Sequence, residues 1–150
     1  MRPGVLRSGL TAGVIAAAAT LGALFAIGHK IGRAVLPLGT VGALIAGHHA
    51  FLFGDPATSR DVLLGVAAQG TICVLWGFVA AWLVIERRVG LAWTALAIAV
   101  ADFCRSWLVA RASGGGLATI VPLGDRLELA LILGVALVAG IRLALPQIRE

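Results

Sequence analysis

The stretch that decides the fold is "VLLGVAAQGTICVLWGFVAAWLVI", residues 62–85, which contains no charged residue. An α-helix needs about 20 consecutive apolar residues to cross the hydrocarbon core of a bilayer, so this stretch predicts a transmembrane helix. It is preceded by Asp61, which we expect to be its N-cap, and it stops at "ERR", residues 86–88.

Three further apolar runs are long enough to span a membrane. They are Ser8–Ile27, Gly90–Ala110 and Leu127–Leu145. Arg111 and the glycine-rich "ASGGG" end the second of these runs, "GDR" opens the third, and Pro146 ends it. The sequence therefore predicts an all-α integral membrane helical bundle, a single domain over residues 1–150 with four transmembrane helices.

The composition agrees with a membrane protein. Apolar residues make up 60% of the chain and charged residues 13%, whereas about a quarter of a soluble domain is charged. The excess of basic residues gives a net charge of +5, and these residues lie at the ends of apolar runs. We therefore expect the lipid bilayer and its anionic headgroups as partners, and no nucleic acid. The composition resembles that of small multi-pass proteins of the bacterial cytoplasmic membrane, where we expect this chain.

The N-terminus has some features of a signal peptide, since Arg2 and Arg7 precede an apolar run. The run is longer than a typical signal-peptide core, however, and no A-x-A cleavage site follows it. We expect it to be retained as the first transmembrane helix. Basic residues divide almost evenly between the two sides, and the small bias favours four spans with both termini inside.

A fifth segment, "VLPLGTVGALIAGHHAFLFG" at residues 35–54, is less apolar and contains Pro37, four glycines and two histidines. It has three interpretations: a weak fifth span, a re-entrant segment, or a helix lying partly in the interface. Glycine and proline favour irregular backbone, which is tolerated at membrane depth where protein or water covers it. We favour the re-entrant segment.

The candidate site is a polar group inside the predicted bundle. Asp102 lies near the centre of the Gly90–Ala110 run, and Arg105 and Ser106 follow at spacings that place them on the same helix face. A carboxylate at that depth must be paired, protonated or in contact with water, because burying its charge in lipid is costly.

The short connection at residues 86–90 predicts that the two flanking helices are antiparallel neighbours. Counting outward from it places Cys73 opposite Asp102, and adds Gln69 and Thr71 to one polar layer with Asp102, Arg105 and Ser106. A re-entrant segment would bring His48 or His49 against this layer. One interpretation is structural, with an Asp102–Arg105 pair and Gln69 as hydrogen-bond glue between helices; the other is a proton or ion path.

A haem site is a weaker hypothesis, and we predict no metal site or cofactor. Adjacent helical residues point about 100° apart, so His48 and His49 cannot bind one iron from opposite sides. His29 lies at a predicted helix end, and nothing pairs it with either of them.

Small residues at four-residue spacing predict where helices pack closely. These residues are Gly9, Gly13 and Ala17; Cys73, Gly77 and Ala81; and Ala130 and Gly134. We expect Cys73 and Cys104 to be small buried apolar residues. The four tryptophans, Trp76, Trp82, Trp93 and Trp107, are expected to anchor helix ends at the membrane surface.

The sequence contains no hydrolase, zinc-protease, P-loop or dinucleotide-binding motif in its required context, so we expect no enzymatic activity. The favoured function is an accessory or structural subunit that packs in a larger membrane complex or against its own copies. The rival is a small transporter or a proton or ion conduit centred on Asp102, Arg105 and Gln69. The third hypothesis is a redox subunit that binds haem or quinone.

Overall fold

The computed structural model describes residues 3–47, 58–114 and 117–145, and within these ranges it contains six helices and no strand. The helices are α1 Pro3–Lys30, α2 Leu36–Ala46, α3 Ser59–Ile85, α4 Leu91–Ser113, α5 Leu117–Ile120 and α6 Leu123–Ala144. Four of them, α1, α3, α4 and α6, are long and apolar enough to cross a membrane. The predicted all-α membrane bundle with four spans is confirmed.

Helices α1, α3 and α6 begin three to five residues before the predicted apolar runs and α4 begins one residue after, because local hydrogen bonds decide where a helix starts. The expectation that Asp61 caps α3 is wrong: the N-cap is Thr58, whose hydroxyl accepts from the Asp61 backbone N–H at 3.2 Å. The Asp61 carboxylate accepts in return from the Thr58 backbone N–H, which completes a capping box. At α6 the N-cap is Pro122, and Asp125 of the predicted "GDR" opening lies in the first turn.

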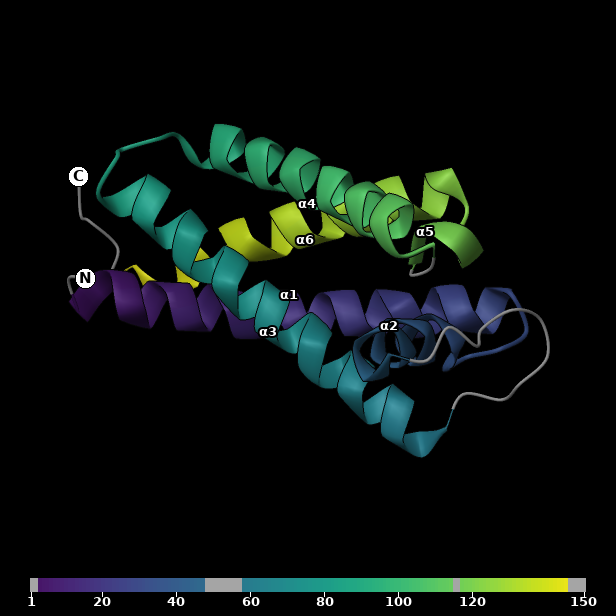
Figure 1. Ribbon diagram of the computed structural model, residues 1–150. Helices are drawn as coiled ribbons and strands as arrows, with labels where there is room; N and C mark the ends of the chain where they lie inside the picture. Colours follow the sequence, from purple (N-terminus) through teal and green to yellow (C-terminus); the bar gives the residue numbers. More distant parts are fainter. Residues whose placement is uncertain (1–2, 48–57, 115–116, 146–150) are drawn as a thin grey trace.

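The long helices run alternately up and down (Figure 1). The start of α1, the α3–α4 connection and the end of α6 lie at one end of the bundle, which we call the termini end. The end of α1 and the start of α3 lie at the other end, which we call the Lys30 end. This arrangement is the one expected of four spans with both termini on one side of the membrane.

Helix α3 packs mainly against α1 and α2, whereas α4 packs mainly against α6. Figure 1 shows α3 crossing α1 diagonally and moving away from α4 with distance from their connection. The two helices are therefore antiparallel and joined by a short turn, as predicted, but most of their length is not in mutual contact.

Glycines allow the closest approach, between α1 and α3. A Cβ on Gly13 would lie 2.6 Å from the Cα of Val74, and one on Gly77 would overlap the backbone of Gly9. Only a residue without a side chain allows the two backbones to meet here, and the shared surface then gains dispersion energy along both helices. The predicted close packing at Gly9, Gly13 and Gly77 is confirmed as a contact within the chain.

The described part of the fifth segment, α2, is an eleven-residue helix. At 1.5 Å per residue it extends about 16 Å, roughly half of a bilayer core, so it is not a fifth span. Gly42 and Gly65 bring α2 onto the backbone of α3. Helix α1 ends and helix α3 begins at the Lys30 end, an arrangement that a re-entrant segment and an interfacial helix share (Figure 1). Residues 48–57, with His48 and His49, lie outside the described residues.

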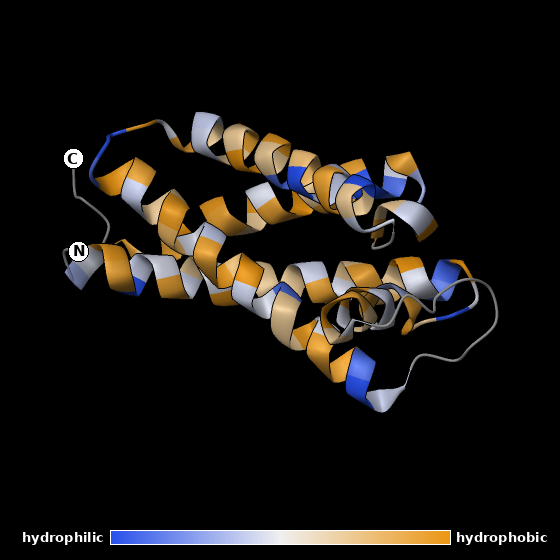
Figure 2. Cartoon of the chain, in the orientation of Figure 1, coloured by the Kyte–Doolittle hydropathy of each residue, from blue (hydrophilic) through white to orange (hydrophobic). Residues whose placement is uncertain are grey.

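The outward faces of the long helices are apolar along most of their length, and the hydrophilic residues gather mainly toward the helix ends (Figure 2). Trp93 is 71% exposed, and Leu63 and Leu143 are exposed to a similar degree. Such continuous apolar surface is costly in water, and a lipid bilayer removes that cost. The fold is that of a multi-pass membrane protein.

Candidate functional site

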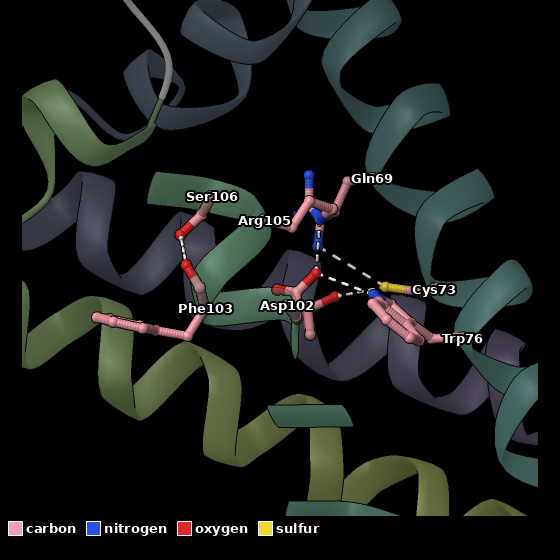
Figure 3. Close-up of polar contacts among 8 residues, drawn as sticks. Gln69, Cys73, Trp76, Asp102, Phe103, Arg105 and Ser106 are labelled. Atoms are coloured by element: carbon pink, nitrogen blue, oxygen red, sulfur yellow. Dashed lines mark hydrogen bonds and ion pairs between the residues drawn. The ribbon is translucent and has the colours of Figure 1, made fainter. Parts of the chain in front are cut away.

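The centre of the candidate site is Asp102 on the buried face of α4, with 7% of its surface exposed. Its Oδ1 accepts two hydrogen bonds: one from Arg105 Nε at 2.8 Å, and one from Trp76 Nε1 of α3 at 3.0 Å. No described group donates to its second oxygen, Oδ2. One oxygen of the carboxylate is thus held by a cation and an indole, while the other has no protein donor (Figure 3).

Helix α3 contributes one face to this site. Gln69, Cys73 and Trp76 recur at helical spacing, and Figure 3 shows all three extending from α3 toward Asp102 and Arg105. Gln69 is only 3% exposed, and its amide Nε2 donates to Cys73 Sγ at 3.7 Å. The amide therefore bonds within its own helix rather than across to α4.

Cys73 connects the site to α1. Its Sγ lies 3.3 Å from the Thr20 hydroxyl, which also donates to the Ala16 carbonyl at 2.8 Å. Both residues are fully buried. Helices α1, α3 and α4 therefore each contribute polar atoms to one buried region.

The other predicted members of the layer lie apart from Asp102. Thr71 is on the exposed side of α3, and its hydroxyl donates to the Ala67 carbonyl at 2.8 Å. The Ser106 hydroxyl donates to the Phe103 carbonyl of its own helix at 2.7 Å (Figure 3). Each hydroxyl donates a hydrogen bond to a backbone carbonyl of the preceding turn, which is common for serine and threonine within helices.

Sequence reasoning missed Trp76, which was expected to be an interfacial anchor. Counting from the connection placed Cys73 opposite Asp102, but the contact is made by Trp76, one helical turn nearer the connection. The available signal was that a buried indole N–H needs an acceptor, and Asp102 is the nearest intramembrane carboxylate in the sequence. Trp82 and Trp107 do pack their rings under arginines, Arg87 and Arg111, near helix ends.

The two cysteines also differ from each other. Cys73 is buried as predicted, whereas Cys104 is exposed on α4, so the expectation of burial is wrong there. Position 104 lies on the side of α4 that faces away from α6, where an apolar thiol faces lipid at little cost.

A second polar contact, not predicted, lies between α1 and α6. Lys30 Nζ donates to Asp125 Oδ1 at 2.8 Å. Asp125 occupies the third position of α6, where a carboxylate ordinarily accepts from the N-cap backbone N–H, as Asp61 does in α3. The N-cap of α6 is Pro122, which has no N–H, so this carboxylate is available to the α1 lysine.

Three buried side-chain atoms in the described residues have no hydrogen-bond partner, and all three belong to α4 or α6. They are Thr94 Oγ1, Asp125 Oδ2 and Arg126 Nε. The Arg126 guanidinium lies over the Phe103 ring, 5.8 Å from its centroid. Buried polar atoms in native proteins are nearly always satisfied, by protein or by ordered water. The α4–α6 contact is thus the least satisfied part of the described interior.

The polar side chains described above, Asp102 with Arg105 and Asp125 with Lys30, are suited to ion pairing and to proton binding. The described residues hold no group of three or more side chains suited to bind a metal ion together. Compared with protein families, with curated proteins and with solved structures, the chain shows no match, so its own geometry is what supports a function.

Proposed function

We propose that the protein is a non-catalytic accessory or structural subunit of a membrane assembly, formed with larger membrane proteins or with its own copies. The observation that carries this proposal is the one-sided packing of α4. Helices α1, α3 and α6 each have two substantial helix neighbours, whereas α4 has one, α6.

The uncovered side of α4 suits contact with another transmembrane helix. It exposes Ala97, Ala101 and Cys104, flanked by Trp93 and Trp107. Small residues let a second backbone approach closely, which is how membrane helices associate in the absence of a hydrophobic driving force. The polar centre of the bundle also has internal partners, since Asp102 is paired with Arg105 and Trp76.

The test is isolation of the tagged protein from its native membrane in mild detergent, with the retained proteins identified by mass. A stoichiometric membrane subunit, or a defined homo-oligomer, is the expected result. Ala97→Leu and Ala101→Leu should release that partner, because each fills the uncovered side of α4. Val14→Leu, on the exposed face of α1, is the matched control and should retain it. A monomer free of partners contradicts the proposal.

A conduit for protons or ions is the second candidate, favoured by the Oδ2 atom of Asp102, which has no described donor. Flux across liposomes tests it directly. Asp102→Asn should abolish any flux while the protein remains folded, and equal flux from both proteins contradicts it. No described residue favours the third hypothesis, a haem or quinone site.

A further inference from the structure

The contact between α4 and α6 has a fixed register. Ala95 approaches Gly134, and the Phe103 ring lies under Arg126, so two contacts are separated by eight residues on each helix. In this antiparallel register the residue opposite Asp102 is 127. Asp125 is therefore two residues away along α6, or about 3 Å along the helix axis.

Asp102 and Asp125 thus both lie along the α4–α6 contact, each with an oxygen that has no described donor. Oδ2 of Asp102 has no described donor, and Oδ2 of Asp125 is buried without a partner. Arg126 Nε, a buried donor without an acceptor, is at the same level. Two acceptors and one donor are the groups that hold internal water, which typically makes about three hydrogen bonds to such atoms.

The exposed polar side chains of this region, Lys30 and Arg105, lie toward the Lys30 end. Lys30, the partner of Asp125, is 69% exposed in its side chain, and the Arg105 side chain is 33% exposed. Toward the termini end, the next buried residues on the same face of α4 are Ala99 and Ile98. Ile98 belongs to one buried apolar cluster with Leu133 and Leu137 of α6. Ile98, Leu133 and Leu137 are almost completely buried, and they form an apolar barrier on that side of Asp102.

We propose that Asp102 is a proton-binding site that internal water reaches from the Lys30 end, and that Ile98, Leu133 and Leu137 seal from the termini end. A proton from the aqueous phase passes along water at the Asp125–Arg126 level and forms an O–H bond at Asp102 Oδ2. The donating water regains a proton from the same aqueous phase. The Oδ1 atom remains the acceptor from Trp76 and Arg105.

Each helix around Asp102 contributes charged or titratable side chains. Arg105 lies on α4 itself, Cys73 on α3, and Asp125, Arg126 and Glu128 on α6. Helix α1 presents Thr20 near Cys73, and Lys30 to Asp125. The site takes up a proton, not a metal cation, because Arg105, Arg126 and Lys30 lie among its carboxylates and repel a hydrated cation.

The reporter for this site is Trp76, because its indole donates to Asp102. A variant that keeps Trp76 and carries Trp82→Phe, Trp93→Phe and Trp107→Phe is reconstituted into vesicles with a tag at the N-terminus. External protease cleaves the tag on molecules whose termini face outward, which gives the orientation. The pH is then changed on one side of the vesicle while Trp76 emission is followed.

The expected result is that Trp76 emission responds to pH on the Lys30 side and not on the termini side. Addition of Asp102→Asn should remove the response, and addition of Ile98→Ser should make it follow pH on both sides. The matched control is Leu96→Ser, on the exposed side of α4, which should leave the response one-sided. Emission insensitive to pH on either side, or sensitive from the termini side without the Ile98 change, overturns the proposal. The test needs no partner, so its result is independent of the accessory role proposed above.

Discussion

Trp76 Nε1 donates to Asp102 Oδ1 at 3.0 Å, and so links α3 to α4 where the two helices are otherwise separating. The same oxygen accepts from Arg105 at 2.8 Å, which means that one atom receives a donor from each helix. The carboxylate therefore joins α3, which packs mainly on α1 and α2, to α4, which packs mainly on α6.

Trp76→Phe should destabilise the protein by about 1–2 kcal/mol, because it removes the indole donor and keeps most of the ring. Unfolding in mixed detergent micelles measures the change. Trp93→Phe is the control, since Trp93 is exposed and makes no described hydrogen bond, and it should change stability by less than about 0.5 kcal/mol. Equal stability of both variants would show that the hydrogen bond contributes nothing.

Arg105→Gln alone should lower the free energy of unfolding more than the double substitution of Arg105 and Asp102 does. The single variant leaves the buried Asp102 carboxylate without its cation, at a cost of about 2–3 kcal/mol, below the value for a fully buried pair because Arg105 is partly exposed. Arg105→Gln with Asp102→Asn removes the charge itself and should recover much of that stability. A double-mutant cycle gives the coupling energy, and additive losses would contradict the pairing.

Two glycines of α3 should respond to alanine in opposite directions. Gly77→Ala places a methyl group against the α1 backbone and should cost about 1–3 kcal/mol. Gly70→Ala, in the same helix, meets nothing within 4 Å and should stabilise the protein by about 0.5–1 kcal/mol through the backbone. Denaturation of the two variants side by side checks both signs, and two losses of equal size would argue against the packed contact.

Lys30→Met should destabilise the junction of α1 and α6, because Asp125 then keeps a buried carboxylate without a cation. Lys30→Arg should retain stability, since the cation is kept. Thermal unfolding in detergent distinguishes them, and the difference should shrink at high salt because the lysine is exposed. Arg33→Met, which removes an exposed cation with no described ion pair, is the control for charge alone.

The sequence predicts the number of long helices and the Asp102–Arg105 pair for the same reason: both depend on spacing within one segment. Run length and hydropathy identify a span, and residues three apart share a helix face. The small residues of α1 and α3 also point to a close contact, because only small side chains permit one. These features require no knowledge of how one helix is tilted against another.

The contacts that the sequence does not predict depend on such tilts or on hydrogen bonds at helix ends. The diagonal course of α3 brings Trp76 rather than Cys73 to Asp102, and no local pattern encodes that angle. Lys30 and Asp125 are 95 positions apart in the chain, so their meeting depends on the whole arrangement of α1 and α6. The choice of Thr58 as the N-cap is local, yet Asp61 is an equally acceptable cap by residue type alone.

The order in which the helices are synthesised has a consequence for biogenesis. Helices α1, α2 and α3 emerge from the ribosome before α4 and α6, and α3 packs on both α1 and α2, so these three helices can assemble before α4 is made. Helix α4 then enters the membrane without its main neighbour, because α6 is synthesised after it. Its intramembrane carboxylate is already accompanied, since Arg105 lies one turn away on the same helix and Trp76 is on a helix already inserted. The chain thus supplies the partners of its intramembrane carboxylate before α6 is in place.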